Sequence, residues 1–268
     1  MLKLGVIGIG NMATAIIGGI LKKGIILPQE IMLCDRHPDR HAHLYSQGVV
    51  QAKTECEIVE NCEYVLLAIK PQGFSELLNK IKPYCRAENI FISIAAGISG
   101  DYIKNLLGYD AKVVLVMPNT PISLGYGTTA LSSVSPTTNA EFKTVLSYFS
   151  ACGDAYEIPA NLMKEVIPFN GSSPAFIYRI TQIFVQRATE LGFDEATALK
   201  LFCSTLIGSA HMMVDSGIGL DTLIKMVCSK GGTTLAGLEA MERNNLSGAL
   251  VAGIDDCVKR AYELGQKD

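Results

Sequence analysis

The chain begins with a short apolar strand, a glycine-rich turn and a helix, and this order restricts its fold more than any other feature of the sequence. We predict a strand at residues 2–7, a turn that reads G-I-G-N-M-A, and a helical run at 15–22. The first glycine permits a tight turn, the second lets the backbone approach a pyrophosphate, and the alanine keeps the helix close to the sheet. Five residues of the turn are therefore candidate dinucleotide contacts: Gly8, Gly10, Asn11, Met12 and Ala13. The alternative is a strand-to-helix turn without a ligand.

A second predicted strand, residues 31–34, ends at Asp35. An acidic residue roughly 20 residues after the glycine turn commonly binds the ribose 2′-hydroxyl of NAD. The next residues are strongly basic, and Arg36, His37 and Arg40 could surround the 2′-phosphate of NADP. Asp35 and Arg36 thus favour opposite cofactors, and both NAD(H) and NADP(H) stay open on this evidence. The alternative for the basic run is a solvated loop.

Three further apolar runs are each followed by turn residues, a pattern typical of buried parallel strands; they lie at 64–69, 90–94 and 113–117. Helical segments are predicted between or after them, at 74–81, 99–107 with Ser99 as N-cap, and 138–150, with closing strands at 127–131 and 155–158. Ligands of open α/β sheets bind outside the carboxyl ends of the strands. That rule adds five residues to the candidate crevice: Lys70, Pro71, Ala96, Gly97 and Asn119.

After Pro159 the strand-like runs stop and helical patterns begin. We predict helices at about 174–192, 194–216, 221–227, 233–243 and 246–264. The second of these is apolar nearly all round, and such a helix must be covered on more than one side. We therefore expect a homodimer interface there, the alternative being one compact bundle. The fold class is α/β, with a Rossmann-type dinucleotide-binding domain at 1–160 followed by an all-helical domain at 161–268.

The stretch V-C-S-K-G-G-T-T-L-A-G-L-E-A-M, at 227–241, begins as a polar loop and continues with apolar residues at helical spacing. Gly231 and Gly232 permit close approach of a ligand, and Thr233 or Thr234 can cap the helix. The free N–H groups of a first helical turn, with the helix dipole, form a site for a small anion. Nearby hydroxyls come from Ser229, Thr233 and Thr234. An ordinary loop-to-helix cap is the alternative.

The composition argues against several classes of protein. A net charge of −3 and 7% aromatic residues with no Trp give no general attraction to nucleic acid or to a membrane surface. No apolar run approaches the roughly 20 residues that cross a bilayer, and the start does not have the pattern of a signal peptide. The eight cysteines show no C-x-x-C spacing. We therefore expect a reduced cytoplasmic protein without disulfides, and no metal site.

Taken together, the motifs resemble those of the pyrroline-5-carboxylate reductase family, the last enzyme of proline synthesis. The resemblance covers essentially the whole chain, and the glycine turn at its start is shared with many dehydrogenases. The other motifs are A-x-K-P-Q from Ala68, A-A-G-I at 95–98, V-M-P-N-T-P at 116–121, G-S-x-P-A at 171–175, and S-x-G-G-T-T-x-A-G-L at 229–238. The last is the most specific to the family.

This resemblance implies a Rossmann domain, with Ala68 as a further cofactor contact, and a helical domain through which subunits interleave as a homodimer or a decamer. It favours NADP(H) over NAD(H). The substrate, 1-pyrroline-5-carboxylate, would lie in the 229–234 loop, its carboxylate held by Ser229 and by the N–H groups of Gly232, Thr233 and Thr234. The Thr234 hydroxyl would face the imine nitrogen. Hydride transfer to a cyclic imine needs positioning and exclusion of water but no covalent nucleophile, in agreement with the absence of a nucleophilic triad from the sequence.

The chain departs from the usual family pattern at five positions: Lys164, Asn170, Ser173, Phe176 and Lys230. Ser173 in place of glycine is expected to crowd a tight helix start near the nicotinamide. Lys230 either assists carboxylate binding or points to solvent. These changes bear on rate and substrate preference more than on the reaction class.

Three other functions are compatible with parts of the sequence. One is a reductase of another cyclic imine. A β-hydroxyacid dehydrogenase needs a lysine with an asparagine one turn later on the first long helix, but the helix beginning near Pro174 has no lysine before Lys200. Lys164 precedes that helix without a matching asparagine. A dinucleotide-binding sensor without turnover is the alternative outside the enzymes.

Overall fold

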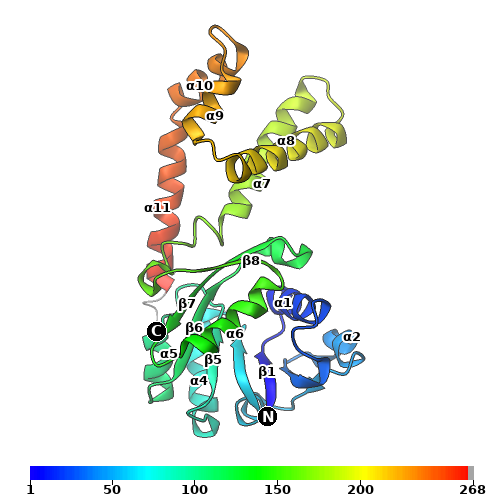
Figure 1. Cartoon of the computed structure of the whole chain (residues 1–268), viewed down its shortest axis with the longest axis vertical. Coiled ribbons are helices and arrows are strands. Elements are labelled where there is room, and N and C mark those ends of the chain that lie inside the picture. The colour runs from blue at the N-terminus through cyan, green and yellow to red at the C-terminus, as the bar shows by residue number, and fades with distance from the viewer. Residues whose placement is uncertain (265–268) are drawn as a thin grey trace. The chain divides into compact units, whose positions relative to one another are not determined.

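The computed structural model describes residues 1–264 and divides into two compact units (Figure 1). The first consists of Met1–Pro174 together with Cys257–Asp268, and the second of Ala175–Asp256. The first unit is α/β and the second is all-helical, which confirms the predicted fold class. Residues 161–174 group with the first unit, and the domain boundary at residue 160 stays a prediction.

The first unit is built on one eight-stranded sheet in the order β3-β2-β1-β4-β5-β6-β7-β8. Neighbouring strands pair in parallel except β6 and β7, which are antiparallel. The strands are β1 (Leu2–Ile7), β2 (Ile31–Cys34), β3 (Val50–Gln51), β4 (Cys62–Leu67), β5 (Ile90–Ser93), β6 (Lys112–Met117), β7 (Gly127–Val134) and β8 (Gly153–Glu157). The parallel strands end at a common edge, so the loops that follow β1, β2 and β4 are neighbours.

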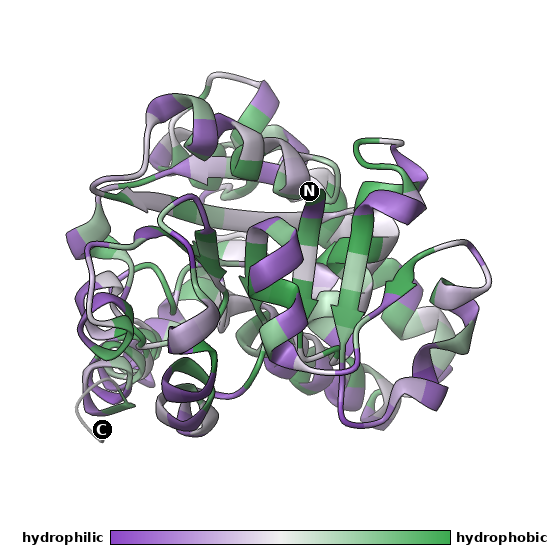
Figure 2. Ribbon diagram, turned by 90° about the horizontal axis from the view of Figure 1, so that it is seen from below, coloured by the Kyte–Doolittle hydropathy of each residue, from purple (hydrophilic) through white to green (hydrophobic). Residues whose placement is uncertain are grey.

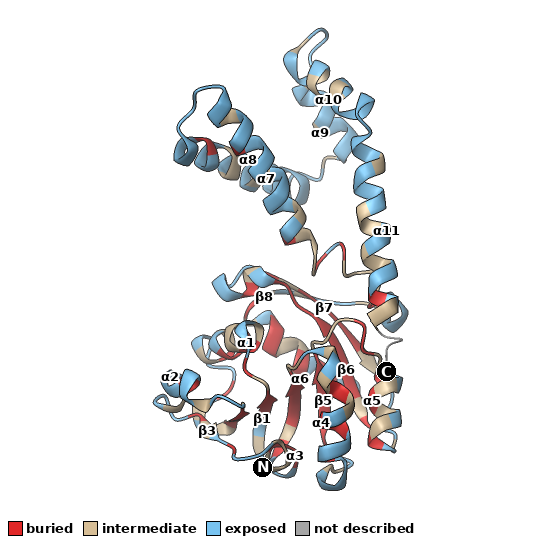
Figure 3. Ribbon diagram, turned by 180° about the vertical axis from the view of Figure 1, so that it is seen from behind, coloured by how far each residue is buried: buried red, intermediate tan, exposed pale blue. Residues whose placement is uncertain are grey.

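Helices cover both faces of this sheet, which is why its central strands are apolar on both sides. Alternate residues of β4 belong to opposite cores: Tyr64 and Leu66 pack with one, Val65 and Leu67 with the other. The helices of this unit are α1 (Asn11–Lys22), α2 (Ala42–Tyr45), α3 (Glu55–Asn61), α4 (Phe74–Ile81), α5 (Gly100–Leu107) and α6 (Asn139–Ser150). Side chains of α1 and α6 form the first core, and those of α3, α4 and α5 the second. The strands are largely apolar in Figure 2 and buried in Figure 3.

The predicted strands of this unit are confirmed, with bounds that move by up to three residues. Three of these strands and α-helices were missed: β3, which has only two residues, and α2 and α3, whose four and seven residues are too few for a clear helical period. Helix α1 begins at Asn11, before the predicted start, because the extended backbone of Gly10 (φ −83°, ψ −177°) already serves as its N-cap.

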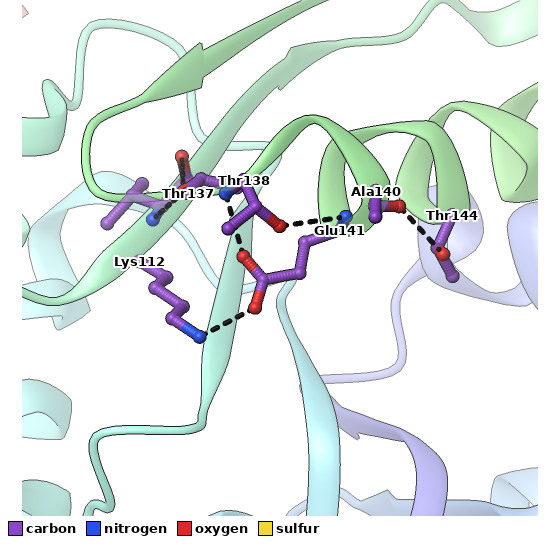
Figure 4. Close-up of polar contacts among 7 residues, drawn as sticks. Lys112, Thr137, Thr138, Ala140, Glu141 and Thr144 are labelled. Atoms are coloured by element: carbon purple, nitrogen blue, oxygen red, sulfur yellow. Dashed lines mark hydrogen bonds and ion pairs between the residues drawn. The ribbon is translucent and has the colours of Figure 1, made fainter.

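The start of α6 is fixed by a reciprocal cap that also reaches the sheet (Figure 4). The Thr138 hydroxyl accepts a hydrogen bond from the Glu141 N–H, and the Glu141 carboxylate accepts one from the Thr138 N–H at 2.8 Å. The second oxygen of that carboxylate accepts a hydrogen bond from Lys112 on β6 at 2.6 Å. One side chain thus satisfies the helix end and joins it to the strand.

Glu141→Gln should lower the free energy of unfolding by about 1 kcal/mol at neutral pH, because it removes a largely buried ion pair and weakens the cap. Burial alone would raise the pKa of Glu141, but hydrogen bonds from Lys112 and Thr138 outweigh it and hold the pKa below its ordinary value. A carboxyl that is more acidic when folded stabilises the protein above its unfolded pKa, and this stabilisation is lost as pH falls through the folded pKa. The difference from wild type in urea unfolding should therefore close as pH drops below about 4.

The exposed residue Glu88 offers a matched control, and Glu88→Gln should leave stability unchanged at both pH values. A Glu141→Gln deficit that persists undiminished in acid would mean that lost packing, rather than lost charge, causes it.

The second unit is all-helical, as predicted. Its segments belong to α7 (Ser173–Glu190), α8 (Glu195–Asp215), α9 (Leu220–Val227), α10 (Thr233–Arg243) and α11 (Leu246–Leu264). Asp194 caps α8 by accepting the Thr197 N–H at 2.9 Å. The rings of Phe184 on α7 and Phe202 on α8 stack with centroids 4.3 Å apart. These contacts leave most apolar side chains of the unit uncovered, and Figure 3 shows its helices as largely exposed.

Large apolar side chains are exposed along both long helices; they include Ile177, Ile180, Ile183, Leu199, Leu201, Ile207, Met212 and Met213. The expectation that no segment is long enough to cross a bilayer was wrong for α8. Within residues 1–264, α8 is the one helix that is long and apolar enough to cross a bilayer, and 6% of its most apolar stretch is buried. A single helix of this kind is weak evidence for a membrane span.

Candidate dinucleotide groove and substrate loop

The two glycines of the first turn are required for different reasons. Gly8 has φ +85°, and a Cβ built there would lie 2.9 Å from the Ala68 carbonyl oxygen. Gly8 therefore has no room for a side chain within the chain itself. A Cβ on Gly10 would have no atom within 4 Å from any residue other than Gly10 and its two chain neighbours. The space beside Gly10 is open to a ligand, and it lies at the N-terminus of α1, where backbone N–H groups attract anions.

A groove of about 470 Å³ begins at this turn and is lined by residues from the ends of β1, β2 and β4 and from α3 and α4. It brings together six of the predicted cofactor residues: Gly8, Gly10, Asp35, Arg36, Ala68 and Lys70. The other nine candidates do not line it: Asn11, Met12, Ala13, His37, Arg40, Pro71, Ala96, Gly97 and Asn119. Three further charged residues line the groove, Glu55, Glu76 and Lys80; they were not predicted because they lie on helices that no nucleotide motif marks.

Asp35 is tied to the backbone at two points, on the glycine turn and after β2. Its Oδ2 accepts the Ile9 N–H at 2.7 Å and its Oδ1 accepts the His37 N–H at 2.8 Å. Burial alone would raise the pKa of Asp35, but these two hydrogen bonds and the nearby histidines outweigh it and leave the pKa below its usual value. The carboxylate therefore stays ionised and fixes the glycine turn to the end of β2. Each oxygen keeps lone pairs for a further donor.

Asn119 has a different position from the one that its motif suggested. It is buried, its Oδ1 accepts the Thr128 N–H at 2.8 Å, and its Nδ2 donates to the Asn170 carbonyl at 3.5 Å. Asn170 is itself buried and donates to the Met117 carbonyl at 2.5 Å. These amides join β6, β7 and the segment before α7. Ser173, which we expected to crowd this helix start, donates its hydroxyl to the Phe169 carbonyl at 2.9 Å.

In the second unit, the loop before α10 forms a tight turn. Gly231 has φ +72°, and the Gly232 N–H donates to the Ser229 carbonyl at 2.9 Å. Gly232 is the N-cap of α10, with extended backbone and no side-chain cap. The expectation that Thr233 or Thr234 caps this helix was therefore wrong, since the helix already includes both residues.

The same turn leaves donors and hydroxyls facing solvent. Ser229, Thr233 and Thr234 are exposed in the single chain. The N–H groups of Thr233 and Thr234 belong to the first turn of α10, so they have no acceptor within the helix. Because the N-cap supplies no side-chain acceptor, these N–H groups are suited to a carboxylate. The Gly232 N–H, assigned to the same carboxylate from the sequence, is occupied within the turn.

Lys164, which we weighed as the catalytic lysine of a β-hydroxyacid dehydrogenase, packs against an aromatic ring of α11 instead. Its Nζ lies 4.4 Å from the ring centroid of Tyr262, and the Tyr262 hydroxyl donates to Glu165 at 2.5 Å. The lysine thus takes part in a local cluster at the end of α11.

Two family models match the chain. One, described as pyrroline-5-carboxylate reductase dimerisation, matches residues 160–264, and the other, described as NADP oxidoreductase coenzyme F420-dependent, matches residues 3–97. Among curated proteins, the pyrroline-5-carboxylate reductase of Escherichia coli is 31% identical over 265 residues, which is 98% of each chain. That of Methanosarcina acetivorans is 32% identical and covers 99% of this chain and 98% of its own.

Solved structures agree over the same length. Pyrroline carboxylate reductase of Plasmodium falciparum, with NADP bound, superposes with a TM-score of 0.89 at 25% identity and covers 99% of this chain and 98% of its own. The reductase of Streptococcus pyogenes has a TM-score of 0.88 at 29% identity, with coverage of 97% and 98%. The likeness therefore includes both units.

Proposed function

Since this chain belongs to the pyrroline-5-carboxylate reductase family, we propose that its groove beside Gly8 and Gly10 holds the dinucleotide and its 229–234 loop holds the substrate. The protein is an NAD(P)H-dependent oxidoreductase, a pyrroline-5-carboxylate reductase. It reduces the C=N bond of 1-pyrroline-5-carboxylate to give L-proline, the last step of proline biosynthesis. The observation that carries this function is end-to-end similarity at more than 30% identity.

The cofactor that we propose is NADP(H), with NAD(H) as the weaker alternative. Two observations support it. Arg36 lines the groove, and its guanidinium suits bidentate binding of a phosphate. The Plasmodium relative was solved with NADP bound.

The cofactor supplies the hydride, and the chain supplies positions and a dry site. We assign the substrate carboxylate to the Ser229 hydroxyl and the N–H groups of Thr233 and Thr234. The Thr234 hydroxyl then orients the imine nitrogen and stabilises the amine that forms. The Gly232 N–H shapes the turn through its bond to Ser229 and has an indirect role.

The protein is a homo-oligomer, since residues 160–264 match the dimerisation region of the family. We propose a homodimer formed through the exposed apolar faces of α7 and α8, with a decamer as the higher assembly. Light scattering on the purified protein separates the two. A reduced cytoplasmic setting remains our prediction from the spacing of the cysteines.

The first test follows consumption of NADPH and of NADH separately, with 1-pyrroline-5-carboxylate as substrate and proline as the measured product. Turnover excludes a dinucleotide-binding sensor, and the two rates rank the cofactors. If the cofactor binds but is not consumed, another cyclic imine becomes the substrate to seek. The first positions to replace with the residues usual in the family are then Asn170, Ser173, Phe176 and Lys230.

Arg36→Ala should raise the KM for NADPH roughly 10-fold and leave that for NADH within about 2-fold, because one charge-assisted contact to the 2′-phosphate is lost. Arg40→Ala is the matched control: Arg40 is an exposed arginine from the same basic run that does not line the groove. Steady-state kinetics with each cofactor give both values. Equal increases for the two cofactors would show that Arg36 does not bind the 2′-phosphate.

A further inference from the structure

An ion pair that no nucleotide motif predicts lies on the wall of the dinucleotide groove. Lys80 Nζ is 2.7 Å from Glu55 Oε2, and the two side chains are 51% and 25% exposed. Both residues line the groove together with Asp35 and Arg36. The groove therefore carries a second close pair of opposite charges besides Asp35 and Arg36, and Lys70 and Glu76 complete its charged lining.

The two helices hold this pair in place. Thr54 caps α3 by accepting the Glu57 N–H, which makes Glu55 the first helical residue. Lys80 lies in the last turn of α4. The helices share one apolar core through residues such as Ile58 and Leu77. The position of the carboxylate and the ammonium is thus set by packed elements rather than by a free loop.

The charges of the pair act on the same region as Arg36. Burial alone would raise the pKa of Glu55, but the hydrogen bond from Lys80 and the charges of Lys80 and Arg36 outweigh it, so the pKa lies below its usual value. Glu55 is therefore ionised at neutral pH. It compensates Lys80 and opposes any second anion that approaches these cations.

We propose that the Glu55–Lys80 pair determines how strongly the groove distinguishes a 2′-phosphate from a 2′-hydroxyl on the adenosine ribose. Lys80 attracts the phosphate, and Glu55 weakens that attraction by pairing with Lys80 and repelling the phosphate. The proposal rests on dinucleotide binding in this groove, as proposed above. It makes selectivity depend on Glu55 and Lys80 as well as on Asp35 and Arg36.

A purely structural bridge between α3 and α4 makes a different prediction. Loss of such a bridge lowers the melting temperature and weakens all adenosine ligands alike, because it distorts the groove as a whole. A charge effect changes only ligands that carry the 2′-phosphate and weakens as salt is added.

The test measures binding of adenosine 2′,5′-bisphosphate and adenosine 5′-monophosphate to the full chain by calorimetry. Glu55→Gln should tighten the bisphosphate about 3- to 5-fold, and Lys80→Met should weaken it by a similar factor, the size expected for partly exposed charges. The monophosphate should change less than about 2-fold in both. In the double variant the gain from Glu55→Gln should shrink, because Lys80 is no longer released.

The matched control is Glu30→Gln, which removes a Lys3–Glu30 pair of 3.2 Å outside the groove and should change neither ligand. Equal changes for the two ligands, or a full Glu55→Gln gain that survives Lys80→Met, would overturn the proposal. Because the ligands are cofactor fragments, the result does not depend on turnover. A protein that fails to reduce pyrroline-5-carboxylate but shows this binding pattern refutes the reaction and keeps the selectivity pair.

Discussion

Gly10→Val is expected to weaken NADPH binding about 100-fold or more, which corresponds to about 2.7 kcal/mol, while the protein keeps its melting temperature. The reason is the open space beside this residue: a Cβ there meets no atom within 4 Å from any residue other than Gly10 and its two chain neighbours. A valine side chain then fills the space that the pyrophosphate needs near the first turn of α1. Fluorescence titration with NADPH gives the affinity, and thermal unfolding reports the fold.

Gly8→Ala provides the contrast in the same turn. Its φ of +85° and the 2.9 Å approach to the Ala68 carbonyl mean that even a methyl group strains the chain. This variant should lose melting temperature, with or without ligand. If Gly10→Val binds NADPH as wild type does, the dinucleotide lies elsewhere and the assignment of this groove is wrong.

Thr234→Ala is expected to lower kcat about 10-fold or more, the cost of one preorganised hydrogen bond to the reacting centre. Thr234 is exposed at the start of α10, and its N–H and hydroxyl have different proposed partners. The alanine variant keeps the N–H for the substrate carboxylate and loses only the hydroxyl at the imine nitrogen. The effect should therefore appear mainly in kcat, with a smaller change in KM, when proline formation is followed at saturating NADPH.

Thr234→Ser is the informative companion, because it restores a hydroxyl and should recover most of the rate. Thr233→Ala removes the neighbouring hydroxyl and should leave kcat close to wild type. Unchanged turnover in Thr234→Ala would remove this hydroxyl from the mechanism, and equal losses in both threonine variants would point to the helix start as a whole.

The parts of the fold that were predictable are those in which a short sequence determines the local geometry. Gly8 needs its left-handed backbone, Ser99 caps α5 through the Tyr102 N–H, and the apolar runs can only be buried strands. The small elements β3, α2 and α3 escaped because two, four or seven residues do not establish a period. Their places come from packing against β2 and the two cores, which a single sequence does not show.

In the candidate site too, the residues that could be predicted are those that belong to a short sequence motif. Gly8, Gly10, Asp35 and Arg36, which line the groove, could be predicted as candidates because they match a nucleotide-binding motif. Glu55 and Lys80 reach the groove from two helices and have no such motif. The hydrogen bond from Gly232 to Ser229 was equally invisible, because it depends on how the loop turns. A motif identifies residues that serve a function, but the donors that remain free for a ligand become known only from the folded chain.

Because of the exposed apolar faces of α7 and α8, we expect the stability of this enzyme to depend on its concentration. A newly made subunit presents side chains such as Ile183, Leu201 and Ile207 to water until it meets another copy. In the homodimer that we propose, association through these faces buries them and so adds to the stability of the folded state by mass action. Dilution should therefore lower the stability of the helical unit. Dissociated subunits should then be more susceptible to proteolysis and to non-specific association. In the proposed homodimer, the concentration of subunits and the stability of the helical unit are therefore linked through the association equilibrium.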